Sequence, residues 1–477
     1  MVKNYSKVLR EVLKKTKPSA EENRKLKSIA RKVMASAKKE ARKFKAKPMI
    51  AGSITRETWL PGKMEFDVFI LFPPAITTKQ LEKRGLDVGK KTIEKLGGSY
   101  KTEYAQHPYV SGKVDNIRID IVPCFDVKTT EHLKSAVDRT PFHVKYLQKN
   151  LPMRLSNEVR VLKQLLTANK IYGADTKTEG FSGYVCELLI IKYKNFLNVL
   201  KHAEKWNSGE IIDMENFYTK KDYIKLKKEF AKQVLILIDP TDKTRNTAAA
   251  LSTENFFKLR KLASEFFSNP REEMFFAKQP EIITENELIT NLLNRETELV
   301  LLKFNPPNIV SDVLWPQLRK FAERLQNILE ETRYEFKVLR RDCYTNEKDL
   351  AIALLEMEVS TLPAVQKKVG PEVFDFDDSK RFLEKYKEIA INGPFVEGNN
   401  WVVEVKRRFR TTREKLMDSL TADANILKAK GIPNHIAEQI AKKFEIITDS
   451  DKIMEIVRKD REFGVFLKKY FSKESLV

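Results

Sequence analysis

Apolar and polar residues alternate along two short segments in the first quarter of the chain, the pattern of β-strands with one buried face. In residues 65–72 the apolar side chains of Phe66, Val68 and Ile70 fall on one face. In residues 117–123 the isoleucines at alternate positions do the same. The opposite face of these two predicted strands carries three carboxylates, those of Glu65, Asp67 and Asp120.

Helical periodicity surrounds these strands. Ser19 and Glu22 form a capping-box signature, and apolar residues at helical spacing follow, so we expect one amphipathic helix over residues 19–45. A crossover helix is expected over residues 77–96. Residues 99–114 then pair with the strand that begins at Ile117, so that the first part of the chain forms a small mixed α/β layer.

Helical spacing resumes at Ser156 and places Lys163 off the apolar face of its helix. Residues 182–206 are apolar throughout and predict a single helix, and residues 207–232 read as a polar connection. A short buried strand ends at the Asp239-Pro240 turn. We expect Arg245 to lie just after this turn, at the start of a helix.

The last 200 residues alternate strands with helices. Strands are expected at 298–304, 334–339, 349–359 and 401–409, and helices near 312–330, 376–389 and over much of 415–477. The order strand, helix, strand, strand predicts an open sheet of the ferredoxin-like kind, backed by helices. The chain has 477 residues, too many for one ordinary core, so we expect several domains.

The charge favours a polyanionic partner. The formal net charge is +22, and residues 1–47 carry 17 Lys or Arg against 4 Asp or Glu. Such an excess suits nucleic acid, although a Lys-rich surface adapted to heat or salt would give the same composition. The second basic stretch is the predicted strand from Trp401 to Arg410, where we expect RNA contact.

The three cysteines, Cys124, Cys186 and Cys343, are far apart and lack metal-binding spacing, which predicts reduced thiols in a cytoplasmic protein. No apolar run is long enough to span a membrane, and no signal peptide is evident, so no membrane partner is expected.

The candidate chemistry lies in residues 48–72. Gly52 would allow close approach of the backbone to a ligand, and Ser53 would open a short helix whose N–H groups attract phosphate, with Arg56 in reach of the same anion. Carboxylates that share a face, as Glu65 and Asp67 do, suit Mg²⁺. Taken alone, such a pair is also the ordinary wet face of a half-buried strand.

The order of these features resembles the nucleotidyltransferase superfamily that includes polymerase beta and the poly(A) polymerases. Longer strings resemble archaeal class I tRNA CCA-adding enzymes, in order over about residues 50–255 and more loosely beyond. These strings are Thr58-Trp-Leu-Pro-Gly62, Asp138-Arg-Thr-Pro-Phe-His143, Asn169-Lys-Ile-Tyr-Gly173 and Gly180-Phe-Ser-Gly-Tyr-Val-Cys-Glu-Leu-Leu-Ile190. One departure is Glu65, where the wider superfamily usually has Asp.

The resemblance implies a polymerase-beta-like head over residues 1–150, a helical neck over 151–280, and an α/β ferredoxin-like body with a tail over 281–477. It implies that Glu65, Asp67 and Asp120 hold Mg²⁺, and that further residues bind the nucleotide. This second group comprises Ser53, Arg56, His143, Lys163 and Tyr172, with Arg245 helping to read the incoming base.

The implied activity is the addition of CCA to the 3′ end of tRNA from CTP and ATP, with the acceptor arm and elbow of tRNA held by the body and tail. A poly(A) or terminal uridylyl transferase is the alternative, and a non-catalytic RNA-binding protein is a third reading. The sequence does not fix the oligomeric state and leaves a homodimer open.

Overall fold

The computed structural model describes residues 5–104, 106–277, 279–331 and 335–472, so Tyr334 and the last five residues of the predicted C-terminal helical region lie outside it. The chain divides into two compact units, one before residue 280 and one from residue 280 onward. Each unit is described by itself. The further boundary that we expect at residue 150 stays a prediction.

The first unit begins with a five-stranded sheet in the order β1-β2-β5-β4-β3. Its strands are β1 (Lys47–Ala51), β2 (Glu65–Phe72), β3 (Ser99–Tyr104), β4 (Pro108–Val114) and β5 (Ile117–Phe125). β2 and β5 run parallel, and the other neighbours are antiparallel. We expected residues 99–114 to form one strand paired with β5. They form two instead, β3 and β4, which pair with each other.

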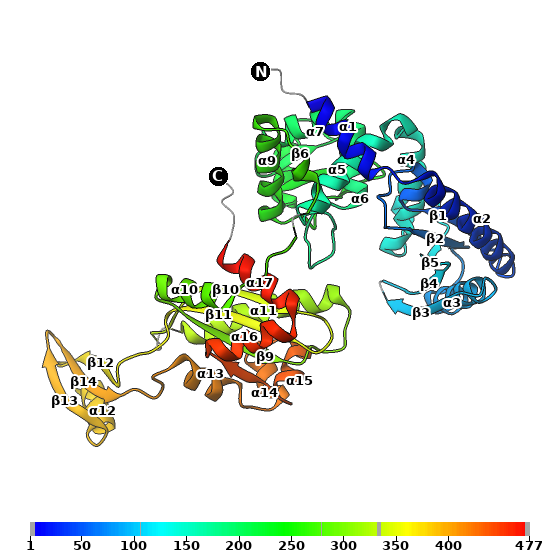
Figure 1. Ribbon diagram of the computed structural model, residues 1–477. Helices are drawn as coiled ribbons and strands as arrows, with labels where there is room; N and C mark the ends of the chain where they lie inside the picture. The colour runs from blue at the N-terminus through cyan, green and yellow to red at the C-terminus, as the bar shows by residue number, and fades with distance from the viewer. Residues whose placement is uncertain (1–4, 105, 278, 332–334, 473–477) are drawn as a thin grey trace. The chain divides into compact units, whose positions relative to one another are not determined.

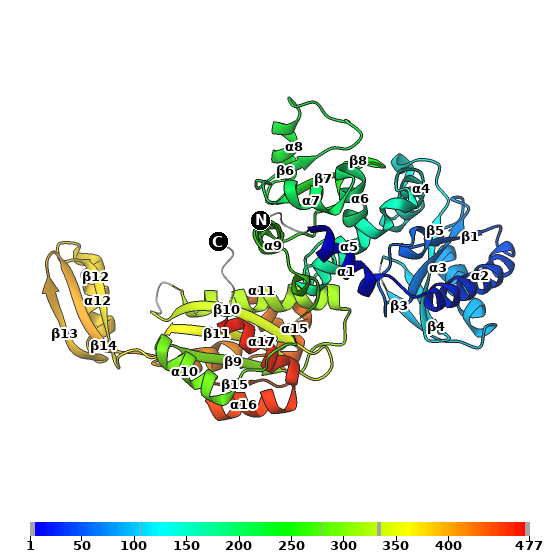
Figure 2. The same cartoon turned by 45° about the horizontal axis from the view of Figure 1, so that its top comes forward.

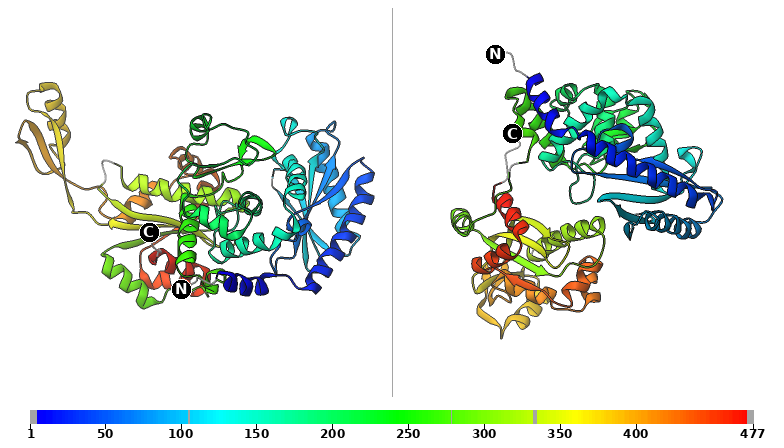
Figure 3. Two further views of the ribbon diagram at one scale, coloured as in Figure 1. Left: turned by 90° about the horizontal axis from the view of Figure 1, so that it is seen from above. Right: turned by 45° about the vertical axis from the view of Figure 1, so that its right-hand side comes forward.

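Two helices, α2 (Ala20–Arg42) and α3 (Thr78–Glu94), cover one face of this sheet (Figures 1 and 3). Both predicted helices are confirmed, and the Ser19 and Glu22 capping box is present. The apolar stripe of α2 packs with Phe66 and Val68 into one core. Burial on that side leaves the carboxylates of β2 and β5 on the opposite face.

The rest of the first unit is mainly helical. Its elements are α1 (Tyr5–Thr16), α4 (Thr140–Asn150), α5 (Ser156–Ala168), α6 (Gly183–Tyr193), α7 (Phe196–Ala203), β6 (Glu210–Ile212), α8 (Tyr223–Glu229), β7 (Leu235–Asp239), β8 (Asp242–Asn246) and α9 (Thr253–Ser268). β6, β7 and β8 form a small sheet (Figure 2). Short 3₁₀ helices lie at Ser53–Arg56, Thr130–His132, Ala136–Arg139, Met153–Leu155 and Glu272–Phe275.

Several expectations for this region are wrong. The single helix over 182–206 is broken at Lys194, which is left-handed with φ 75° and ends α6, and Asn195 caps α7. The supposed polar connection contains β6 and α8. Arg245 lies on β8, while the next helix starts only at Thr253, because the chain after Pro240 turns back to pair with β7.

The second unit contains a four-stranded antiparallel sheet in the order β10-β11-β9-β15. Its strands are β9 (Glu298–Phe304), β10 (Lys337–Thr345), β11 (Ala351–Val359) and β15 (Glu445–Ile447). This is the strand order of a ferredoxin-like sheet, as predicted. The helices of this unit, apart from α12, are α10 (Glu285–Arg295), α11 (Ser311–Leu329), α13 (Thr412–Leu420), α14 (Ala424–Ala429), α15 (Asn434–Ile440), α16 (Ser450–Lys459) and α17 (Arg461–Phe471).

A smaller sheet is inserted between β11 and β15. It consists of β12 (Val365–Glu372), β14 (Asn400–Lys406) and β13 (Ala390–Glu397), with α12 (Phe376–Tyr386) packed against it (Figure 2). The predicted basic strand is shorter than expected. It ends at Lys406, and the Arg407 side chain, 8% exposed, pairs with Glu335.

Across the residues that the structure describes, no helix combines the length and the apolar character that crossing a membrane would require.

Candidate active site

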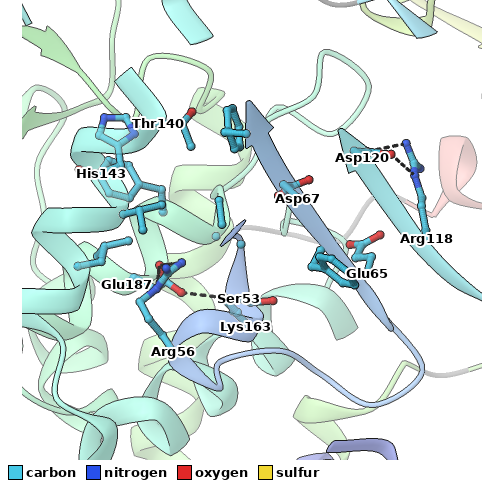
Figure 4. Close-up of a pocket in the computed structure, with 18 of the residues that line it drawn as sticks. Ser53, Arg56, Glu65, Asp67, Arg118, Asp120, Thr140, His143, Lys163 and Glu187 are labelled. Atoms are coloured by element: carbon cyan, nitrogen blue, oxygen red, sulfur yellow. Dashed lines mark hydrogen bonds and ion pairs between the residues drawn. The ribbon is translucent and has the colours of Figure 1, made fainter. Parts of the chain in front are cut away.

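A pocket of about 590 Å³ lies on the face of the large sheet that α2 and α3 leave open. Glu65 and Asp67 reach it from β2, and Asp120 reaches it from β5 (Figure 4). The parallel register pairs Asp67 with Asp120 directly. The three carboxylates predicted from strand alternation therefore line one pocket.

The carboxylate of Asp67 is half-buried beside two other acids. Its burial, followed by the charges of Asp120 and Glu65, raises its pKa to about 6. Gly52 makes the close approach of the neighbouring turn possible, since a Cβ at this position would lie 3.2 Å from Asp67 Oδ2. Gly52 also has φ 83° with ψ −177°, a backbone conformation that is almost restricted to glycine.

Asp120 is held by its own neighbours. Arg118 donates to both carboxylate oxygens, at 3.2 and 3.1 Å, and Ser111 Oγ donates to Oδ1 at 2.6 Å. Arg118, which our sequence interpretation gave no role, also lines the pocket. Its position beside a carboxylate on the same strand face follows from the alternation that placed Asp120 there.

Among the described residues, no group of three or more His, Cys, Asp or Glu side chains is arranged as a metal site. The donor chemistry nevertheless fits a hard divalent cation, because three carboxylates on adjacent strands share one pocket wall. Two observations agree with a cation position here: the pKa of Asp67, raised by its burial and then by the charges of Asp120 and Glu65, and the guanidinium of Arg118 paired with Asp120.

A second wall of the pocket carries a buried ionic cluster. Glu187, 1% exposed, lies between Arg56 and Lys163, which are 7% and 3% exposed. Glu187 Oε2 accepts from Arg56 Nε at 3.1 Å, and Oε1 accepts from Thr58 Oγ1 at 2.6 Å and from Lys163 Nζ at 3.4 Å. Burial would raise the pKa of Glu187, but Lys163 and Arg56 hold it below its ordinary value.

The cluster changes how the two cations are understood. Lys163 was expected off the apolar face of its helix, yet its amine is buried against Thr58 and Glu187. Glu187 belongs to one of the strings that carry the resemblance, but nothing in its local sequence marked it as a partner of Arg56, 131 residues away.

Tyr172 and Ser53 complete this part of the pocket lining. Ser53 is the first residue of the 3₁₀ helix 53–56, as predicted. The Tyr172 hydroxyl lies 3.0 Å from where a Cβ of Gly183 would be, so glycine there leaves room for the hydroxyl. Burial raises the pKa of the Tyr172 hydroxyl, which therefore stays protonated.

His143 reaches the pocket from the first turn of α4, which begins at Thr140 and has Pro141 as its second residue. Its ring stacks on Tyr184, with 4.1 Å between ring centroids, and its Nε2 lies 2.8 Å from Asp239 Oδ2. Arg245 Nη1 donates to the same oxygen at 2.8 Å. Arg245 does not itself line the pocket and is joined to His143 through Asp239.

Comparison with known proteins covers almost the whole chain. The family model described as a nucleotidyltransferase domain matches residues 31–143. The model for the second domain of tRNA nucleotidyltransferase matches 157–276, and the C-terminal domain of the CCA-adding enzyme matches 295–449. A CCA-adding enzyme of Methanosarcina mazei is 33% identical over 96% of this chain and 97% of its own length.

This chain belongs to the CCA-adding enzyme family. It is 36% identical to the CCA-adding enzyme of Archaeoglobus fulgidus, over 84% of this chain and 86% of that protein. It is 33% identical to that of Haloarcula marismortui, over 99% of each. The resemblance drawn from the sequence and the predicted fold class are confirmed, and the protein is a nucleotidyltransferase.

A solved structure of a cytoplasmic RNA terminal U-transferase aligns with 58% of this chain and 99% of its own, with a TM-score of 0.45 and 13% sequence identity. Similarity at that level does not indicate the substrate. Nucleotidyltransferases of this superfamily generally use divalent metal ions, in agreement with the carboxylate wall of the pocket.

Proposed function

We propose that this CCA-adding family member completes and repairs the 3′-terminal CCA of tRNA in the cytoplasm, using CTP and ATP and no nucleic-acid template. The observation that carries the proposal is one pocket with two unlike walls. The direct pairing of Asp67 with Asp120 gives an anionic wall, and the Arg56, Glu187 and Lys163 cluster gives a wall that contains two cations.

We assign the anionic wall to the reacting centre. Glu65, Asp67 and Asp120 would hold Mg²⁺, which when bound lowers the pKa of the RNA 3′ hydroxyl and stabilises the pyrophosphate leaving group. In the reaction, the 3′ oxygen bonds to the α-phosphorus of the nucleotide while the bond from that phosphorus to pyrophosphate breaks. We assign Asp120 to the side of the attacking hydroxyl.

The opposite wall would bind the triphosphate. Arg56 and Lys163 supply positive charge, and Ser53 supplies a hydroxyl and a backbone N–H at the start of a short helix. Glu187 fixes both cations before the nucleotide arrives, which lowers the cost of ordering two long side chains. Tyr172, held protonated, can donate a hydrogen bond to the nucleotide.

His143 would contact the nucleoside portion, and Arg245, joined to it through Asp239, would help to read the base. Basic surfaces would hold the acceptor arm and elbow of tRNA through its phosphates, so that recognition does not depend on one tRNA sequence. The first 47 residues contain 17 basic and 4 acidic residues, which gives them a net charge of +13 out of +22 for the whole chain.

The test is extension of a labelled tRNA that lacks CCA, with CTP, ATP, both or neither, and with added Mg²⁺. We expect two C residues with CTP alone, one further A only when ATP is present, and no product from Asp67→Ala. The matched control is Asp87→Ala, because Asp87 is an exposed carboxylate on α3 that pairs with Lys91 and lies outside the pocket. Open-ended A or U tails, or activity in Asp67→Ala, would contradict the proposal.

A further inference from the structure

Asp239, at the end of β7, is the most completely satisfied carboxylate near the pocket. Its side chain is fully buried. Oδ2 accepts from His143 and Arg245, each at 2.8 Å. Oδ1 accepts from the backbone N–H and the hydroxyl of Thr241, at 2.9 and 2.8 Å, and from the Tyr184 hydroxyl at 3.3 Å. Residues from α4, α6 and the β7-β8 hairpin thus converge on one side chain.

These contacts fix the orientation of two residues that we assign to the nucleotide. Burial works to raise the pKa of Asp239, but the His143 and Thr241 hydrogen bonds lower it overall, so the carboxylate is ionised. His143 Nε2 must then carry a hydrogen atom and donate a hydrogen bond to Asp239. This leaves Nδ1 as the ring atom that can meet a ligand in the pocket.

Arg245 is fixed at one end and open at the other. Its Nη1 donates to Asp239 Oδ2, the oxygen that His143 Nε2 also contacts. Sharing this oxygen keeps the Arg245 guanidinium close to the His143 ring. The Arg245 side chain is 38% exposed, so its remaining donors can face a ligand. A guanidinium has donors only, in a rigid planar fork, and its direction decides what it can bind.

The bases that CCA synthesis needs share a pattern that such a fork can read. Cytosine at N3 and adenine at N1 each present an acceptor beside an exocyclic amino group. Uracil at N3 and guanine at N1 each present an N–H beside a carbonyl. A fixed donor therefore favours the first pair and opposes the second, whereas a donor free to rotate could also meet the carbonyl of uracil or guanine.

We propose that Asp239 is a positioning residue for base selection, holding the donors of Arg245 in one place beside His143 so that cytosine and adenine are accepted while uracil and guanine are rejected. This inference rests on the proposed function. It assigns Asp239 no contact with the substrate, and its effect passes through Arg245.

The hairpin offers a matched control. Asp242 also accepts from the backbone and hydroxyl of a threonine two residues on, Thr244, at 3.2 and 2.7 Å, and it also pairs with an arginine, Arg139, at 3.0 Å. It makes no contact with His143 or Arg245 among the interactions that the structure records for the described residues. Asp242→Asn thus removes the same type of charge from the same turn without loosening Arg245.

The experiment measures kcat/KM for CTP and UTP at the first addition, and for ATP and GTP at the third, with a tRNA substrate. Asp239→Asn should lower the preference for CTP over UTP by about tenfold or more, the discrimination of one well-placed base contact. Asp239→Glu, which keeps the charge but moves the carboxylate, should do the same. Asp242→Asn should leave the ratio within about twofold of wild type.

The ratio of kcat/KM between the correct and the incorrect nucleotide also separates a positioning role from a loss of folded protein. A partly unfolded sample would lower the incorporation rate of all four nucleotides equally and leave the ratio unchanged. Arg245→Gln should lower the same ratio, and adding Asp239→Asn to it should change the ratio little further. Equal slowing of all four nucleotides in both Asp239 variants would overturn the inference, as would full discrimination in Arg245→Gln. A wild-type protein that adds no CCA would instead refute the proposed function.

Discussion

Glu187 gives the sharpest test of the cation wall. Both of its oxygens are committed, to Arg56 on one side and to Thr58 and Lys163 on the other. In Glu187→Gln the amide keeps one acceptor oxygen and turns an NH₂ group towards a cation. Arg56 and Lys163, each less than 10% exposed, would be left without a compensating charge.

The burial of Arg56 and Lys163 sets the loss of stability expected in Glu187→Gln. Removing one partner of a buried ion pair typically costs about 3–5 kcal/mol, because the other charge stays buried and unpaired. In a unit of this size that corresponds to a fall in Tm of about 6–20 °C. Because the pKa of Glu187 is lowered, its stabilising contribution is present above the ordinary value of 4.5 and is lost as the pH falls further. The difference in Tm between wild type and Glu187→Gln should therefore narrow below about pH 4.5.

The assay combines thermal unfolding with CTP kinetics. Saturating CTP and Mg²⁺ should narrow the difference in Tm if Arg56 and Lys163 bind the triphosphate, and the KM for CTP should change in the variant. The control is Glu356→Gln in the second unit, where a fully buried carboxylate pairs with Arg295 at 2.6 Å and Arg340 at 3.1 Å. It should lower stability without altering the KM for CTP. A Glu187→Gln protein as stable as wild type would refute the reasoning.

Three further predictions follow from other parts of the first unit. In metal-free protein at pH 8, Asp67→Asn should raise Tm, because the fold raises the Asp67 pKa to about 6. The stability cost of ionising Asp67 grows from about pH 4 to about pH 6 and is fully present above that. A gain in Tm as large at pH 5 as at pH 8 would contradict this. Gly52→Ala should lose activity and about 1–3 kcal/mol of stability, since its backbone conformation strains other residues. The control is Gly97→Ala, which also strains a left-handed backbone (φ 68°) but has open space for a Cβ and lies outside the pocket, so it should lose stability and keep activity. Changing exposed basic residues of α2 to Gln should weaken tRNA binding and flatten its dependence on salt, because fewer phosphate contacts release fewer counterions. The control changes the exposed Lys380, Arg381 and Lys385 of α12 to Gln, which should alter the salt slope less per residue. An unchanged slope in the α2 variant would exclude RNA contact there. The α2 set is Arg24, Lys32, Lys38, Lys39 and Arg42.

The sequence alone determined the features that depend on near neighbours. Strand alternation placed Glu65, Asp67 and Asp120 away from the apolar core, and the structure has all three on one pocket wall. The capping box at Ser19 and the helical spacing after it located α2. These patterns can be read because each side chain's face follows from its position in one element.

Family likeness added what periodicity could not. The strings shared with CCA-adding enzymes directed attention to His143, Lys163, Tyr172 and Arg245, which no local pattern distinguishes from ordinary surface residues. The relatives confirm the family, while the role of each residue stays a prediction to be tested by the variants above.

Only the tertiary structure decided which partners these residues meet. Glu187 lies 131 residues from Arg56, and Asp239 lies 96 residues from His143, so neither contact leaves a trace in local sequence. Arg245 was expected at a helix start and instead lies on β8, because pairing with β7 overrode the local signal. Buried charges need partners, and the partners come from whichever segments the fold brings together.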